Sequence, residues 1–272
     1  MSPHTTRPAA VAGFFYPGDP HTLRGDIRRY LADAAARAAG GAEGGANQAP
    51  KALVAPHAGY VYSGPVAATA YAALAPLRHQ ITRVILIGPA HRVRVEGLAT
   101  VSVDAFQTPL GDVPVDRVAL EAVLDLPQVT VHDEAHRQEH SLEVHLPFLI
   151  EALEDFAIVP FAVGGATGEE VAEVLERLWG GPETLVLISS DLSHHNDYVT
   201  ARAMDEATTA AIERLDPDAI GRDAACGRMP IKGLLLQARR LGLTAETVDL
   251  RSSGDTAGSR DQVVGYGSYV FR

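Results

Sequence analysis

Three histidines follow three runs of residues that have the composition of buried strands. The pairs of strand and histidine are Ala52–Ala55 with His57, Arg83–Gly88 with His91, and Thr184–Ser189 with His194. In open α/β sheets, ligands bind at the edge where the parallel strands end, so we expect the three imidazoles to share one cleft there. Clustered imidazoles suit zinc, copper or iron better than magnesium or calcium. Any one of these histidines alone is as readily a hydrogen-bonded loop residue, and only their shared position favours a transition-metal site.

The chain has a single cysteine, Cys226, which lies just before a predicted helix over 231–241. Pro230 suits the first turn of that helix. A thiol at a helix N-terminus has a lowered pKa because it faces the positive end of the helix dipole, and the neighbouring Arg228 would lower the pKa further. The sequence leaves three roles open for Cys226: a metal ligand, a nucleophile, or a small buried apolar residue.

Asp191 lies three residues before His194. A carboxylate that accepts a hydrogen bond from one imidazole nitrogen fixes the tautomer of the ring and raises its basicity. Asp191 is therefore a candidate partner of His194, and both are candidates for moving a proton in the cleft. The alternative is that Asp191 caps a helix beginning at Leu192.

A further group of histidines surrounds the segment His136–His140, whose residues HRQEH match H-x-x-E-H, the signature of inverted zinc peptidases. That chemistry needs both histidines on one face of a continuous helix, and the polar run around them leaves little room for one. A peptidase is the least favoured reading. The residues here that could line a cleft, or else belong to a solvated polar loop and helix start, are Glu139, His140, Glu143 and His145.

The elements that must position these residues alternate along the chain. We predict strands over 52–55, 83–88, 98–103, 129–132, 158–163, 184–189, 247–251 and 263–271. We predict helices over 21–39, 63–77, 117–124, 141–152 and 169–179, and three more between 199 and 241. Short apolar strands that alternate with helices are typical of a largely parallel sheet covered on both faces. The sequence therefore predicts one three-layer α/β/α domain over residues 1–272, around a mainly parallel or mixed sheet, with a mobile Gly-rich loop at 40–50.

Composition and charge exclude several classes of protein. Of the 272 residues, 46% are hydrophobic and 21% are charged, which is the balance of an ordered globular chain. The formal net charge of −11 disfavours nucleic acid and anionic membranes as partners. The N-terminal segment lacks the pattern of a signal peptide, and no apolar run approaches the ~20 residues that cross a bilayer. A single cysteine fits a reducing compartment, so we expect a cytoplasmic protein.

Several longer segments resemble, in the same order, those of the Memo family, whose bacterial and archaeal members are also called AmmeMemoRadiSam system protein B. They include LVAPHAGYVYSGPVAATAY at 53–71, ILIGPAHRV at 85–93, EHSLEVHLPFL at 139–149, ISSDLSHH at 188–195 and CGRMPIKGLL at 226–235. The resemblance extends from Arg7 to Phe271, which is nearly the whole chain.

This resemblance implies a fold similar to that of class III (LigB-type) extradiol dioxygenases, which hold a non-haem iron with two histidines and a carboxylate. It implies that His57 and His91 are metal ligands and that Cys226 takes the place of the carboxylate. It also implies that His194 acts as a general acid–base residue, with Asp191 beside it. His140 is expected as a further cleft residue.

The resemblance also guides the expected cofactor and partners. We expect iron first, with copper or zinc as alternatives because a thiolate ligand favours these metals too. An oxidoreductase-like activity on a small molecule or O₂ is implied, together with partners of the radical-SAM and AMMECR types. The alternative is a non-enzymatic module that binds a peptide or a protein in the same cleft. Aromatic residues that would line the cleft in either case are Phe14, Phe15, Tyr16, Tyr60 and Tyr62.

Overall fold

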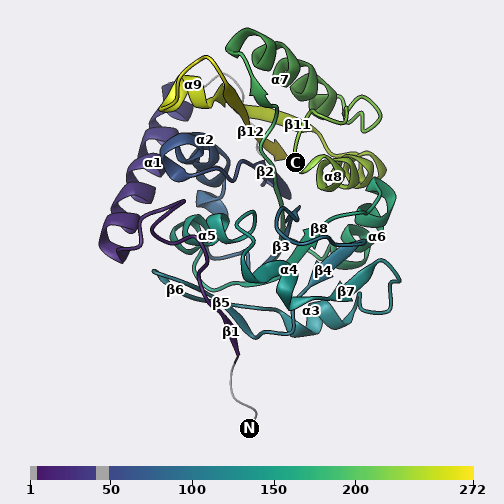
Figure 1. The fold of residues 1–272 in the computed structure, drawn as a ribbon. Coiled ribbons are helices and arrows are strands. Elements are labelled where there is room, and N and C mark those ends of the chain that lie inside the picture. The colour runs from purple at the N-terminus through teal and green to yellow at the C-terminus, as the bar shows by residue number, and fades with distance from the viewer. Residues whose placement is uncertain (1–4, 41–48) are drawn as a thin grey trace.

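A nine-stranded mixed sheet runs through the molecule, which the computed structural model describes over residues 5–40 and 49–272 (Figure 1). The strands follow the order β10 (His194–Asn196), β12 (Val263–Phe271), β2 (Ala52–Ala55), β9 (Thr184–Ser189), β3 (Arg83–Pro89), β8 (Ala157–Val163), β4 (Leu98–Thr100) and β7 (Val129–Val131), and β11 (Ala245–Ser252) pairs with β12. The central strands β2, β9, β3 and β8 are parallel to one another. β12 and β4 join this central group in the antiparallel direction.

The composition of the central strands explains why they are buried. β9 (TLVLIS) and β3 (RVILIGP) are nearly continuous apolar runs, and almost all of their residues are shielded from solvent. Strands that are covered on both faces have this composition, whereas strands with one wet face alternate between polar and apolar residues. The hydrophobic core therefore lies on both sides of these strands.

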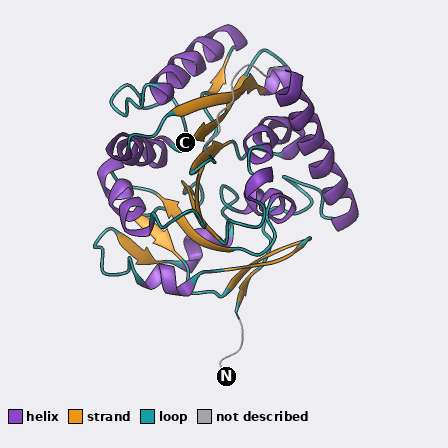
Figure 2. Ribbon diagram, turned by 180° about the vertical axis from the view of Figure 1, so that it is seen from behind, coloured by secondary structure: helices purple, strands orange, loops and turns teal. Residues whose placement is uncertain are grey.

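Helices cover both faces of the sheet, as Figures 1 and 2 show. The helices on one face are α1 (Pro20–Gly40), α2 (Tyr60–Ala72) and α5 (Leu146–Ala152). Those on the other face are α6 (Gly168–Leu178), α7 (Tyr198–Glu213) and α8 (Arg228–Leu241). On the first face α1, α2 and α5 contact one another, whereas on the second face α6 contacts α8 and α7 packs on β11 and β12. These layers confirm the predicted α/β/α architecture.

Smaller elements complete the fold. A second sheet joins β1 (Thr6–Arg7), β5 (Ala105–Thr108) and β6 (Gly111–Pro114). The shorter helical segments are α3 (Arg117–Glu121), α4 (Asp133–Arg137), α9 (Ser253–Thr256) and the 3₁₀ turns Ala75–Leu77 and Glu143–His145. The hairpin of β5 and β6 has Pro109 in its turn and Pro114 at the end of β6, and β1 ties the N-terminal arm to it by parallel pairing.

Two segments differ from the sequence prediction for physical reasons. Between β10 and β11, a stretch that the structure describes throughout, there are two helices where the sequence predicts three. α7 ends because Leu215 adopts a positive φ of 53° and Pro217 follows, so the chain up to Gly227 stays irregular. α2 begins at Tyr60, three residues earlier than predicted, and Pro65 therefore lies inside the helix instead of in its first turn.

Two further expectations concern the chain as a whole. Within the described residues, no helix combines the length and the apolar composition needed to cross a bilayer. Of the Gly-rich loop predicted at 40–50, residues 41–48 lie outside the described part of the chain.

Candidate metal centre

The carboxyl ends of β2, β9 and β3 lie side by side, because β9 pairs in parallel with both of the other strands. His57 follows β2, His91 follows β3, and Asp191 follows β9, each within two residues of the strand end. Cys226 approaches from the loop before α8. The ligand atoms of His57, His91 and Cys226 all lie within 4.8 Å of one another. His57 Nε2 and Cys226 Sγ are 3.4 Å apart, close to the roughly 3.5 Å that separates two ligands of a tetrahedral zinc ion.

The hydrogen bonds of His57 determine which of its nitrogens carries a lone pair. The side chain is buried, and Nδ1 lies 2.6 Å from Ser189 Oγ. Ser189 Oγ donates its own hydrogen to the carbonyl of Ser141 at 2.6 Å, so it must accept the bond from Nδ1–H of His57. Nε2 is then unprotonated and faces Cys226. Burial and the neighbouring histidines lower the pKa of His57 well below its usual value, which keeps the ring neutral as metal binding requires.

His91 is oriented by a carboxylate, Glu139. Nδ1 of His91 lies 2.9 Å from Oε1 of Glu139, so Nδ1 carries the hydrogen and Nε2 has the lone pair. Burial acts to raise the pKa of Glu139, but the bonds from His91 and Ser141 outweigh it and lower the pKa to about 2. Glu139 is therefore ionised. The sequence indicates only that Glu139 could line a cleft, not that it bonds His91.

Cys226 does not have the lowered pKa that the sequence predicts. Burial, followed by the negative charge of Asp191, raises the pKa of the Cys226 thiol to about 12. α8 begins only at Arg228, with Gly227 as its N-cap, so the helix terminus does not compensate for burial of the thiol. The amide of Asp191 donates a hydrogen bond to Sγ at 3.3 Å. A thiol with a raised pKa is a poor free nucleophile, so the environment of Cys226 disfavours that role and leaves the metal-ligand and buried apolar roles open.

Asp191 and His194 are not bonded to each other, contrary to the pairing that the sequence suggests. Asp191 accepts hydrogen bonds from the amides of His57, at 2.7 Å, and Ala58. Its Oδ2 lies 4.0 Å from His57 Nε2, and burial raises the pKa of the carboxyl to about 7. Nδ1 of His194 instead bonds the carbonyl of Leu192 at 2.8 Å. Asp191 also caps no helix, because the chain continues into β10.

β10 is a strand that the sequence pattern does not predict, and it carries His194. Between His194 and Asn196 the register with β12 shifts, and His195 adopts a positive φ of 61°. Because a carbonyl occupies Nδ1–H of His194, its Nε2 is unprotonated. Burial and, to a smaller extent, His195 and His91 lower the pKa of His194.

His140 lies directly beside His57 and His91, two of the three candidate metal ligands. Its ring stacks on His91, with 4.7 Å between ring centroids, and lies 5.4 Å from the ring of His57. The ring of Phe15 also lies against it, with 4.6 Å between ring centroids. Burial lowers the pKa of His140 to about 4, and its Nδ1 has no hydrogen-bond partner among the described residues.

The H-x-x-E-H pattern does not form a peptidase site. α4 ends at Arg137, so His136 and His140 do not share a helix face. His136 Nε2 bonds the carbonyl of Ala99 at 2.8 Å, and the buried ring lies 6.0 Å from that of Phe106. His136 is therefore a core residue of the fold.

Glu143 and His145, also considered as cleft residues, have structural partners. The groups that bond or ion-pair with the Glu143 carboxylate are the side chains of Arg7 and Tyr16 and the amides of Ala10 and Val11. Glu143 thus fixes the N-terminal arm to the body. Nδ1 of His145 bonds the hydroxyl of Tyr71 at 2.6 Å, in the core.

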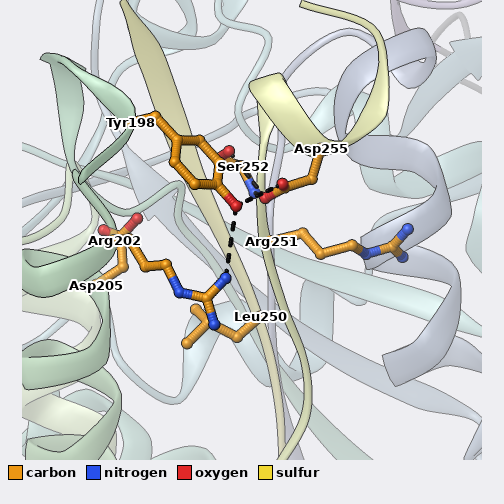
Figure 3. A pocket seen from close by; sticks show the side chains of 7 residues that line it. All are labelled: Tyr198, Arg202, Asp205, Leu250, Arg251, Ser252 and Asp255. Carbon is orange, nitrogen blue, oxygen red and sulfur yellow. Dashed lines mark hydrogen bonds between the residues drawn. The ribbon is translucent and has the colours of Figure 1, made fainter. Parts of the chain in front are cut away.

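A separate small hollow of about 20 Å³ lies between α7 and the junction of β11 and α9 (Figure 3). Its lining residues are Tyr198, Arg202, Asp205, Leu250, Arg251, Ser252 and Asp255. The polar groups bond one another or near neighbours: the Tyr198 hydroxyl donates to Asp255 at 2.7 Å, and Arg251 pairs with Asp249. Among the described residues that line this hollow there is no histidine or cysteine, so the hollow is distinct from the group of His57, His91 and Cys226.

Comparison with known proteins identifies relatives over nearly the whole chain. Residues 7–270 match the family described as Memo-like protein. A MEMO1 family protein of Archaeoglobus fulgidus is 36% identical over 274 residues, which cover 96% of this chain and 98% of the relative. A MEMO1 family protein of Aquifex aeolicus is 36% identical over 281 residues, or 97% and 98% of the two chains. Among solved structures, an uncharacterized protein from Escherichia coli K12 has a TM-score of 0.48 and 13% identity, over 81% of this chain and 99% of that chain.

Proposed function

The chain belongs to the Memo family, and on that premise we propose that it binds a transition-metal ion through His57, His91 and Cys226. The observation that carries this proposal is the approach of the three ligand atoms to within 4.8 Å of one another. The hydrogen bonds to Nδ1 of both histidines support it, because they leave both Nε2 atoms unprotonated. Two imidazoles and a thiolate suit iron, copper or zinc, with iron as our first choice.

Three protein ligands leave coordination positions for a small molecule, as in catalytic metal sites. When bound, the metal would supply a Lewis acid and, if it is iron or copper, a redox centre. We propose an oxidoreductase-like activity toward a small molecule, with proton transfers handled by the protein. His194 and His140 would relay protons: burial lowers both pKa values, so each ring is neutral at rest and readily gives up a proton that it accepts. Asp191 would hold a proton near neutral pH, since burial raises its pKa to about 7.

Metal content after anaerobic purification tests the ligand set. We expect the Cys226→Ser and His57→Ala variants to lose more than about 90% of the metal that the wild type retains, because each removes one of three protein ligands. His136→Ala is the matched control: it removes a buried imidazole that bonds Ala99 in the core. Equal metal content in the wild type and in Cys226→Ser would contradict the proposal.

The alternative function, a non-enzymatic binding module, is favoured by one observation beside the cleft. Phe14 is 89% exposed and adjoins Phe15, which contacts His140. A partner would cover such a side chain, and proteins of the radical-SAM and AMMECR types are the proposed partners. Oxygen uptake by iron-loaded protein in the presence of catechols would favour the enzyme, whereas partner capture that is unchanged in His57→Ala would favour the module.

A further inference from the structure

A buried carboxylate, Glu139, contacts His91 on the side opposite its unprotonated nitrogen. Only 1% of the Glu139 side chain is exposed. Its Oε1 accepts hydrogen bonds from Nδ1 of His91 at 2.9 Å and from the amides of His140 and Ser141 at 3.0 Å each. Its Oε2 accepts a bond from the amide of His91. The carboxylate thus holds both the ring and the backbone of His91.

Glu139 is itself held in place by Arg7 of the N-terminal arm. Its backbone carbonyl accepts a hydrogen bond from Arg7 Nη2 at 2.6 Å, and Arg7 is buried. Arg7 also bonds the carbonyl of His136 at 2.8 Å. The segment that carries Glu139 is therefore anchored by the N-terminal arm, so the carboxylate has a fixed position relative to the end of β3.

We propose that Glu139 is a positioning residue, which holds His91 as the Nδ1–H tautomer and directs its Nε2 at the metal. The proposal rests on the proposed function, since it presupposes an ion at the His57, His91 and Cys226 group. A carboxylate behind a ligating imidazole raises the basicity of the ligand and fixes its orientation. His57 has a neutral hydroxyl, Ser189, in the equivalent place. The two imidazole ligands thus differ, and His91 is the stronger electron donor.

A competing role for Glu139 is direct metal binding together with His91 and His140, whose ligand atoms also lie within 4.8 Å of one another. Both oxygens of Glu139 already accept hydrogen bonds, and Nδ1–H of His91 donates one of them. Direct metal binding by Glu139 would compete with these bonds. The positioning role keeps all of them.

Glu139→Gln tests the proposal, because glutamine has nearly the same shape and keeps a side-chain oxygen but carries no charge. The histidine tautomers are read from the ¹⁵N chemical shifts of metal-free protein, and zinc affinity and stoichiometry from competition with a chromophoric chelator. We expect zinc affinity to fall about 10- to 100-fold at unchanged stoichiometry. We also expect the Nδ1–H form of His91 to dominate in the wild type and to lose population in the variant.

Asp205→Asn is the matched control. Asp205 of α7 is another buried acidic residue, but its carboxylate accepts from the amide of Ser193 and bonds neither Arg7 nor a candidate ligand histidine. Glu139→Asp, which keeps the charge on a shorter side chain, provides a second variant, with an affinity expected between those of wild type and Glu139→Gln.

Several results would overturn the positioning role. They are an unchanged zinc affinity in Glu139→Gln, an equal loss of affinity in Asp205→Asn, and the loss of one of two bound zinc ions in Glu139→Gln. The last result would assign Glu139 as a ligand. A wild-type chain that binds neither zinc nor iron nor copper would contradict the proposed function itself. The tautomer of His91 in the metal-free protein would then still decide whether Glu139 controls the ring.

Discussion

Ser189, at the end of β9, links His57, a proposed metal ligand, to the segment after α4 that contains Ser141. Its hydroxyl accepts from His57 and donates to the carbonyl of Ser141. The hydroxyl of Ser141 in turn donates to the carbonyl of Pro89, at the end of β3, at 2.7 Å. Two serines therefore connect the strand ends from which both imidazoles arise, and they do so without any charge.

Removing the hydroxyl of Ser189 should weaken the metal site without removing a ligand. In Ser189→Ala, Nδ1–H of His57 loses its acceptor, so the ring is no longer held with Nε2 toward Cys226. We expect zinc affinity, measured by chelator competition, to fall about 10- to 100-fold. Ser193→Ala is the matched control, because Ser193 is equally buried and its hydroxyl does not bond His57. Similar affinities in the two variants would contradict this account.

The loop before α8 carries Cys226, the proposed sulfur ligand, and Gly227 allows this loop to approach β9 closely. The amide of Gly227 bonds the hydroxyl of Ser190 at 2.8 Å, which brings the loop against the end of β9. A Cβ at Gly227 would lie 2.6 Å from the carbonyl oxygen of Ser189 and 2.7 Å from Cβ of Ser190. Backbone atoms of a central strand cannot shift cheaply, so the position requires a residue without a side chain.

Gly227→Ala should therefore destabilise the fold and displace Cys226. We expect the free energy of unfolding in urea to fall by about 1–3 kcal/mol, which is typical of overpacking, with a parallel loss of zinc affinity. Gly221→Ala in the same loop is the control, because a Cβ there has no atom within 4 Å. If both alanine variants were as stable as the wild type, the close approach at Gly227 would not constrain the loop.

Local patterns predict the elements well and their mutual contacts less well. The bounds of β2, β9 and β12 were predictable residue by residue, because each is a buried run bordered by turn residues. The placement of His57 and His91 at one sheet edge followed from parallel topology alone. The acceptor of the His91 hydrogen, Glu139, and the raised pKa of Cys226 depend on segments far apart in the chain. Neither the period of hydrophobicity nor a helix-start signal reports such contacts.

At the scale of the whole molecule, α7 is fastened to the sheet by a buried carboxyl group. Asp205 of α7 accepts a hydrogen bond from the amide of Ser193 at 3.0 Å, next to His194. A Cβ at Gly265 of β12 would lie 1.9 Å from Oδ2 of Asp205, so the carboxyl group packs directly on that strand. Burial raises the pKa of Asp205 to about 6, although the bond from Ser193 acts in the opposite direction.

This raised pKa makes the stability of the protein depend on pH in a predictable direction. Between about pH 4 and pH 6 the folded chain holds a proton on Asp205 that the unfolded chain has lost, so the contribution of Asp205 to stability falls as the pH rises. The difference between a pKa of about 6 and the ordinary 3.8 corresponds to at most about 3 kcal/mol.

In Asp205→Asn the amide oxygen can still accept from Ser193, but the side chain does not titrate. The free energy of unfolding of this variant, minus that of the wild type, should therefore rise by up to about 3 kcal/mol from about pH 4 to about pH 7 in urea titrations. Taking this difference cancels the titration of all other groups, so parallel pH profiles for the two proteins would show that Asp205 is not a protonated anchor of α7.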